Sequence, residues 1–154
     1  MIIPEKMYSQ IVLLMPIPCV DIIVEDSRGK ILLIRRADEP AKGQWWFPGG
    51  RVHYLEMRRQ AAIRKLREEC GLEACHLADV ATYDIILEMP GNIAPRHGIT
   101  TVFHAKVGMQ NDLSLDVHGS AAEWRLPAEW LSAGLHFFVR QGLSVLLKDQ
   151  DEAQ

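Results

Sequence analysis

The chain has 154 residues, of which 48% are hydrophobic and 24% are charged, a balance that excludes a disordered chain and allows one packed core. This length fits a single domain spanning residues 1–154 and leaves no room for a second. The formal net charge of -3 lacks the basic excess with which proteins follow a nucleic-acid backbone, so we expect a small-molecule partner and no nucleic acid.

An apolar stretch near the N-terminus, residues 11–23, is the first segment that could suggest a membrane helix. It contains two prolines and Asp21, and it is shorter than the roughly 20 apolar residues that a spanning helix needs. The first ten residues also lack the basic start and apolar core of a secretion signal. Three cysteines without metal-ligand spacing are typical of structural thiols in a reducing compartment. We therefore expect a cytoplasmic protein without a membrane segment.

Two strands joined by a turn are the next elements that the sequence predicts. Residues 20–25 and 30–35 are rich in apolar side chains, and the turn residues Asp-Ser-Arg-Gly separate them, which predicts a hairpin. The short apolar run at 45–47 predicts a buried strand, which the following Pro-Gly-Gly ends.

A helix is expected at residues 57–70, because Ala62, Leu66 and Cys70 fall on one helical stripe. Gly71 is the residue type that commonly ends a helix. The later elements are strands at 77–87, 99–107 and 122–126, a short helix at 128–132, a longer helix at 136–148, and frayed residues at 149–154. Together these elements predict an α/β (α+β) fold.

The segment from Gly49 to Leu72 carries the most specific pattern in the chain. At fixed offsets it contains Gly50, Glu56, Arg64, Leu66, Glu68, Glu69, Gly71 and Leu72. These positions resemble the Nudix box, in which Gly, five residues, Glu and seven residues precede Arg-Glu-aliphatic-x-Glu-Glu-x-Gly-aliphatic. The resemblance implies a Nudix-type α/β/α sandwich with a mixed β-sheet, and an enzyme of the Nudix hydrolase superfamily.

The acidic residues of this segment are suited to bind a metal ion. Carboxylates on one exposed face of a helix converge on one point, and oxygen ligands are those that Mg²⁺ prefers. We therefore expect Glu69 and Glu68 to bind Mg²⁺, with Mn²⁺ as the alternative. Gly50 is expected to add a backbone carbonyl, because glycine permits a close approach. Glu56 and Arg64 are expected to form a charge pair that holds the loop on the helix.

A solvated helix face is the alternative interpretation of the same charges. Pairs four residues apart, Arg64 with Glu68 and Lys65 with Glu69, would stabilise such a face. This alternative gives no reason for the paired glycines, Glu56 and the closing glycine at their fixed offsets. We therefore favour the metal site.

Lys65 departs from the Nudix pattern, because most members of the family have a Glu at this position. An ammonium one turn before Glu69 removes an acceptor and repels a cation. We therefore expect fewer metal ions than is usual in the family, as few as one, and no base at the usual position.

Residues 18–52 narrow the resemblance. Together with the box they are similar to the GDP-mannose mannosyl hydrolase branch of the family, whose box also lacks that Glu, and the likeness runs from about Pro18 to Leu72. That branch is understood to cleave at the sugar carbon and to release GDP and the hexose. The resemblance implies a homodimer, and it implies that the residues that bind substrate or metal are Asp21, Arg36, Arg51, Arg64 and Glu69.

Arg36 and Arg51 also fit a diphosphate on charge grounds. Guanidinium forks match phosphate oxygens, and fixed cations would stabilise the negative charge that a leaving GDP gains. Without the resemblance, Arg36 would be interpreted as a solvated strand end.

Two histidines are the candidates for proton transfer in the second half of the chain. The branch has a base and a metal ligand on a late loop, and residues 116–120 stand at that place here. His118 is the side chain in this loop whose pKa suits proton transfer near neutral pH, so it is the candidate base or ligand. A surface histidine without a role is the equal alternative. His97 is the second candidate.

The sequence predicts Mg²⁺-dependent hydrolysis of a nucleoside diphosphate linked to another group, first of all GDP-mannose or a similar GDP-sugar. One alternative is an ordinary Nudix pyrophosphohydrolase that attacks phosphorus. Another is a nucleotide-sensing module without catalysis, in which Lys65 has disabled the metal site. Catalytic roles are assigned to Arg36, Arg51, Arg64, Glu68 and His118, substrate contacts to Asp21, Arg36, Arg51 and His97, and metal ligation to Gly50, Glu68 and Glu69.

Overall fold

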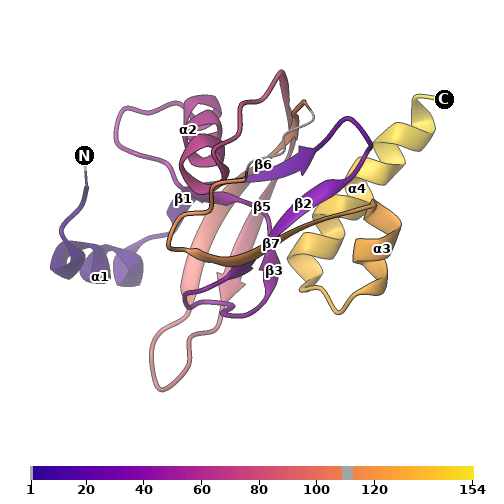
Figure 1. Cartoon of the computed structure of the whole chain (residues 1–154). Helices are drawn as coiled ribbons and strands as arrows, with labels where there is room; N and C mark the ends of the chain where they lie inside the picture. Colours follow the sequence, from indigo (N-terminus) through magenta and orange to yellow (C-terminus); the bar gives the residue numbers. More distant parts are fainter. Residues whose placement is uncertain (1, 109–112) are drawn as a thin grey trace.

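The computed structural model describes residues 2–108 and 113–154. A seven-stranded sheet forms the middle layer, with helix α2 (Arg58–Cys70) on one face and helices α3 (Pro127–Ser132) and α4 (Phe137–Glu152) on the other (Figure 1). The predicted α+β sandwich with a mixed sheet is therefore confirmed.

The strands are β1 (Ile17–Glu25), β2 (Ile31–Arg36), β3 (Trp45–Trp46), β4 (Gly49–Arg51), β5 (His76–Leu87), β6 (Arg96–Lys106) and β7 (Gly119–Arg125). Five of them follow the order β3-β2-β1-β6-β5, while β4 pairs with β1 and β7 pairs with β2. The β1 and β6 strands run parallel, and the other pairs are antiparallel. The sheet is therefore mixed because of one parallel contact at its centre.

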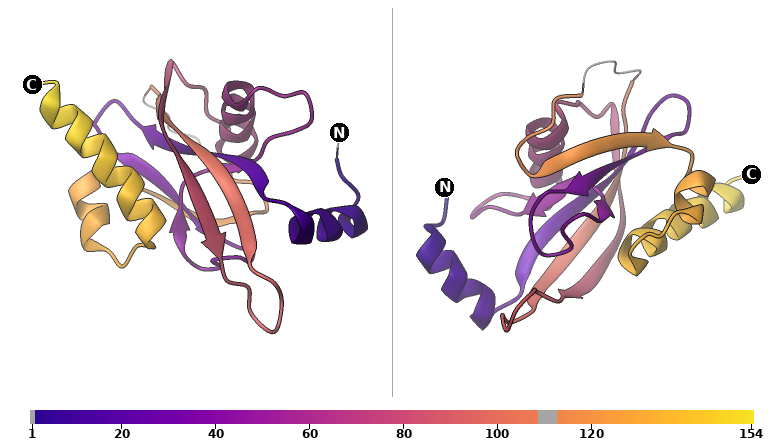
Figure 2. Two further views of the ribbon diagram at one scale, coloured as in Figure 1. Left: turned by 180° about the vertical axis from the view of Figure 1, so that it is seen from behind. Right: turned by 60° about the horizontal axis from the view of Figure 1, so that its bottom comes forward.

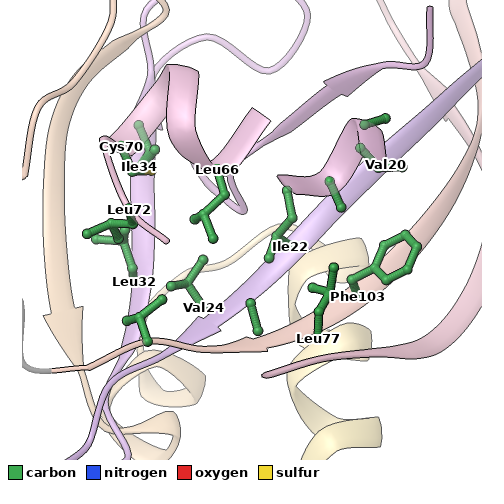
Figure 3. Packing of buried hydrophobic residues seen from close by; sticks show 14 residues of the cluster. Val20, Ile22, Val24, Leu32, Ile34, Leu66, Cys70, Leu72, Leu77 and Phe103 are labelled. Atoms are coloured by element: carbon green, nitrogen blue, oxygen red, sulfur yellow. The ribbon is translucent and has the colours of Figure 1, made fainter. Parts of the chain in front are cut away.

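Strand β1 is covered on both faces. Val20, Ile22 and Val24 belong to the core layer beneath α2, whereas Ile23 belongs to the layer beneath α4. A strand buried on both faces has apolar residues at successive positions instead of alternating ones, which explains the continuous apolar run in this segment. Figure 3 shows the layer beneath α2, where Leu66 points from the helix into the same cluster as these strand residues.

Helix α2 matches the predicted helix closely. Its buried residues include Ala62, Leu66 and Cys70, the stripe on which the prediction rested. Gly71 ends the helix with a φ of 68°, a left-handed conformation that glycine adopts without steric cost.

Helix α1 (Glu5–Leu14) was not predicted from the sequence. It lies beyond the end of the sheet, on the side of the molecule away from α3 and α4 (Figures 1 and 2). Val12 is its one buried residue among those described, so the helix contributes little to the hydrophobic core.

Several boundaries differ from the predicted ones. The expected frayed segment is wrong for residues 149–152, because α4 continues to Glu152. The two glycines of the expected Pro-Gly-Gly stop themselves belong to a further strand, β4, which pairs with β1. Strand β6 begins at Arg96 instead of residue 99, because its pairing with β5 extends to Leu87.

Across residues 2–108 and 113–154, no helix is long and apolar enough to cross a membrane. The three cysteines are free thiols. Burial raises the pKa of both Cys19 and Cys70 to about 12, which keeps these thiols protonated and unreactive.

Candidate functional site

A cavity of about 370 Å³ brings most of the predicted site residues together. Its walls come from α1, from Glu69 of α2, from strands β1 to β6, and from the segment that leads into β7. Seven of the nine residues predicted for the site line it: Asp21, Arg36, Gly50, Arg51, Glu69, His97 and His118. Arg64 and Glu68 are not part of this lining.

Arg64 holds the loop that precedes α2. Its Nε donates to Oε1 of Glu56 at 2.7 Å, and its Nη2 donates to Oε2 of Glu56 at 2.9 Å and to the backbone oxygen of Arg51 at 3.0 Å. The Arg64 hydrogen bonds lower the pKa of Glu56 to about 2. The predicted charge pair is therefore present, and it ties the backbone beside Gly50 to the helix.

Glu69 is largely shielded from water, and both of its carboxylate oxygens have partners. Oε1 lies 3.0 Å from Nζ of Lys65, and Oε2 accepts a hydrogen bond from the backbone N–H of Gly49 at 3.1 Å. Burial raises the pKa of Glu69, and the Lys65 ammonium opposes this rise. The carboxylate thus lines the cavity with one ammonium already against it.

Glu68 lies at the surface of the same helix. Its side chain is 49% exposed, and Oε2 lies 3.1 Å from Nη1 of Arg64 and 3.6 Å from Nζ of Lys65. Both four-residue pairs of the solvated-face interpretation are therefore present, together with the Glu56 pair that this interpretation does not explain.

The two glycines of β4 lie where a side chain would collide with its neighbours. A Cβ on Gly49 would lie 2.2 Å from the backbone oxygen of Val20 and 2.7 Å from Oδ1 of Asp21. A Cβ on Gly50 would lie 2.7 Å from Cε of Lys65. Close packing of β4 against the backbone of β1 therefore requires glycine at position 49, whereas at Gly50 the neighbour is the flexible end of Lys65.

The acidic residues near Glu69 are of the type that binds cations, but they do not form a metal-binding cluster among the described residues. Asp21, Glu69 and Asp116 line the same cavity, and carboxylate oxygens are ligands that Mg²⁺ prefers. In the part of the chain that the structure describes, no group of three or more His, Cys, Asp or Glu residues is arranged to hold a metal ion.

Asp21 is the buried acid of the cavity. It is 8% exposed, and its Oδ2 accepts a hydrogen bond of 2.6 Å from Oγ1 of Thr100 on the neighbouring strand β6. Burial raises the pKa of Asp21 to about 7, with Thr100 opposing the rise and Glu69 adding to it. A carboxyl group with this pKa can hold or release a proton near neutral pH.

Arg36 and Arg51 bring positive charge to the cavity. Nε of Arg36 donates to the backbone oxygen of Pro40 at 2.7 Å, and the guanidinium of Arg51 lies 4.4 Å from the ring centre of Tyr8. Among the described residues, no carboxylate is within salt-bridge distance of either guanidinium. Both groups therefore keep donors for an anion such as a diphosphate.

His118 lies at the rim of the cavity and is held on two sides. Its Nδ1 donates to Oδ2 of Asp38 at 2.7 Å, and its backbone N–H donates to Oδ1 of Asp116 at 2.9 Å. Because Nδ1 is engaged, Nε2 is the ring nitrogen that remains for proton transfer. His97 lines the cavity from the start of β6, beside Arg96.

Several contributors to the site were missed from the sequence, among them Tyr8, Val12, Thr100 and Asp38. Tyr8 and Val12 line the cavity from α1, and their four-residue spacing was a usable helical signal. Asp38 contacts His118 across 80 positions of the chain, and no local pattern predicts such a contact.

Comparison with known proteins gives a consistent family assignment. The family model described as NUDIX domain matches residues 15–144. The chain is 29% identical over 147 residues to the low-salt glycan biosynthesis protein Agl8 of Haloferax volcanii, covering 94% of this chain and 90% of that protein. It is 30% identical over 122 residues to an RNA pyrophosphohydrolase of Novosphingobium aromaticivorans, covering 70% and 74%. A CTP pyrophosphohydrolase of Escherichia coli is 44% identical over 70 residues, which cover 45% of this chain and 50% of that protein.

Solved structures share the fold over most of the chain. A MutT protein from Methanosarcina mazei Go1 superposes with a TM-score of 0.75 at 21% identity, covering 88% of this chain and 96% of that one. The NUDIX domain of Shewanella oneidensis NrtR, solved as a complex with ADP ribose, gives 0.74 at 20% identity and covers 96% and 99%. At these identities the likeness establishes the fold alone.

Proposed function

Because the chain belongs to the Nudix hydrolase family, whose members generally use divalent metal ions and act on small nucleotides, we propose that it hydrolyses a GDP-sugar. The leading substrate is GDP-mannose, the leading metal ion is Mg²⁺, and the products are GDP and the free hexose. The observation that carries this proposal is the meeting of two unpaired guanidinium groups, a buried acid and a carboxylate-held histidine around one cavity.

The size and charge of the cavity support a nucleotide sugar. Its volume of about 370 Å³ lies within the range of small-molecule sites, roughly 300–1,000 Å³. Arg36 and Arg51 would bind the diphosphate, and their fixed charge would stabilise the negative charge that GDP gains as it leaves. The similarity to a protein named for glycan biosynthesis favours a sugar-linked substrate.

His118 is the proposed base. Its Nδ1 is bound to Asp38, so Nε2 would accept the proton of the attacking water. Asp21, buried and with a pKa near neutrality, would form a hydrogen bond to the sugar, and His97, which also lines the cavity, would contact the substrate.

Glu69, the backbone of Gly50 and the exposed Glu68 are the proposed ligands of the divalent cation. When bound, this cation would neutralise charge on the diphosphate. Arg64 would act by holding the loop and the backbone beside Gly50 in place, a positioning role that agrees with its place outside the cavity lining.

An ordinary pyrophosphohydrolase reaction is the second candidate. Two relatives are named for pyrophosphate hydrolysis, of RNA and of CTP, and both Glu68 and Glu69 of the box are retained. Attack would then take place at phosphorus instead of carbon. The third candidate, a sensor without catalysis, is favoured by the Lys65 ammonium against Glu69.

One incubation separates the three candidates. The protein is incubated with GDP-mannose and Mg²⁺ in ¹⁸O-labelled water. The products are then separated, and mass spectrometry identifies them and shows which one carries the label. GDP with labelled mannose supports the proposal, whereas GMP with mannose 1-phosphate establishes attack at phosphorus. Binding of GDP-mannose without either product set, checked against Glu69→Gln as the inactive control, identifies a sensor.

The homodimer implied by the resemblance remains a prediction. Light scattering during gel filtration measures it directly, since a dimer has twice the mass of the 17.4 kDa chain.

A further inference from the structure

The Lys65 ammonium lies in a shielded position between two carboxylates. Its Nζ is 3.0 Å from Oε1 of Glu69 and 3.6 Å from Oε2 of Glu68. The side chains of Lys65 and Glu69 are only 13% and 12% exposed, so water screens their attraction much less than it screens an ordinary surface pair. The attraction between these two groups is therefore stronger than that of a surface pair.

The aliphatic part of the Lys65 side chain also lies against Gly50 of strand β4. A Cβ on Gly50 would lie 2.7 Å from Cε and 3.3 Å from Nζ of Lys65. The ammonium thus occupies the space between Gly50 and Glu69, the two groups on which the proposed metal site depends. The other oxygen of Glu69 is already bonded to the backbone N–H of Gly49.

The positive charge of Lys65 offsets negative charge around Glu69. Glu69 is surrounded by further acids, since Asp116 adds to the rise of its pKa and Glu69 in turn raises that of Asp21. Carboxylates withdrawn from water need a nearby cation to remain ionised. Lys65 supplies that charge from within the chain, as a bound metal ion would from solution.

We propose that Lys65 is a resident cation of the Glu69 site, which competes with divalent metal for Oε1 and must be displaced before metal binds. Displacement needs only a small movement, because Glu68 offers the ammonium a second acceptor on the solvent side. The proposal rests on the proposed function in one respect, the assignment of Glu69 as a metal ligand. It implies weak metal binding and a metal-free form that is already neutralised.

A binding measurement tests the proposal without reference to catalysis. Free Mn²⁺ is measured by electron paramagnetic resonance during titration of the wild type and of Lys65→Met, which keeps an unbranched side chain one atom shorter and removes its charge. We expect Lys65→Met to bind Mn²⁺ at least tenfold more tightly, and the gain to disappear when Glu69→Gln is added. Unchanged or weaker binding in Lys65→Met overturns the proposal.

Arg67→Met is the matched control. Arg67 lies on the same helix and pairs at the surface with Glu73, with side chains 61% and 63% exposed. Its removal takes the same charge from α2 without touching Glu69, so we expect Mn²⁺ affinity to stay within twofold of the wild type. If Arg67→Met gains as much Mn²⁺ affinity as Lys65→Met, the effect comes from the overall charge of α2, which contradicts the proposal.

A second variant covers the risk that Lys65→Met folds poorly, since it leaves a shielded carboxylate without its cation. Lys65→Gln keeps a hydrogen-bond donor for Glu69, and Mn²⁺ should raise its melting temperature more than that of the wild type. An equal rise in both proteins contradicts competition. If the wild type does not turn over GDP-mannose while these binding results hold, the proposed substrate is refuted and the role of Lys65 is not.

Discussion

Nδ1 of His118 lies 2.7 Å from Oδ2 of Asp38, and this contact joins the segment before β7 to the loop after β2. The same two segments are also joined through the backbone, where the N–H of Ala37 donates to the carbonyl oxygen of His118 at 3.0 Å. The histidine is therefore presented at the rim of the cavity by a fixed pair of loops.

Asp38→Asn tests whether this contact orients the base. An amide cannot hold the Nδ1 proton as a carboxylate does, so the ring would sample both tautomers, and we expect kcat to fall about tenfold with little change in KM. The tautomer is measured by ¹⁵N NMR of the histidine ring. An unchanged tautomer with an unchanged kcat removes Asp38 from the mechanism, and His118→Asn serves as the control that loses the base itself.

Glu56→Gln tests the pair that holds the loop. The pKa of Glu56 is lowered from the model-compound range to about 2, so its ionised form stabilises the fold above about pH 4.5, and this stabilisation is lost as the pH falls towards 2. We expect the variant to be less stable at pH 7 by about 1–3 kcal/mol and to approach the wild type near pH 2.

Urea unfolding of both proteins between pH 2 and pH 7 checks this prediction. A stability difference that stays constant over the whole range would show that the loss comes from packing and not from the charge of Glu56.

Asp21→Asn should have the opposite pH dependence. Burial raises the pKa of Asp21 from 3.8 to about 7, so the folded state favours the protonated acid, and stability is lost as the pH rises through this interval. The variant is expected to match the wild type near pH 4 and to exceed its stability at pH 8 by on the order of 2 kcal/mol. Thermal melts with a chelator present measure the difference, and a variant that is less stable at pH 8 contradicts the assigned burial cost.

Tyr8→Ala tests the contribution of α1. Tyr8 lies 4.4 Å from the guanidinium of Arg51, and a contact of this kind is worth about 0.5–1 kcal/mol at an exposed site. We expect KM for the nucleotide substrate to rise about threefold, with no change in melting temperature beyond 2 °C or so. Tyr8→Phe keeps the ring and should behave as the wild type; equal defects in the two variants point to the hydroxyl instead of the cation contact.

The helix that carries Glu68 and Glu69 and the core strands could be predicted because their signals are local. A stripe such as Ala62, Leu66 and Cys70 repeats at the helical period, and the backbone geometry of a helix alone brings such residues to one face. The pairing of Glu56 with Arg64 spans only eight positions, so it also lies within reach of a motif. The fold followed from these local periods, since few layer arrangements bury such elements.

Contacts between distant segments could not be predicted from the same signals. Asp38 meets His118 across 80 positions, and Asp21 meets Thr100 across 79, because strands that are remote in the chain become neighbours in the sheet. The burial that moves the pKa of Asp21 to about 7 arises from that same packing.

The sequence by itself determined the family, the helix that carries Glu68 and Glu69, and the presence of a lysine among its acids. Only the tertiary structure decided that the Lys65 ammonium pairs with Glu69, that Arg64 holds a loop outside the cavity lining, and that α1 lines part of the cavity. The physical reason is that backbone periodicity orders side chains along one element, whereas the shape and charge of a cavity depend on how separate elements pack together.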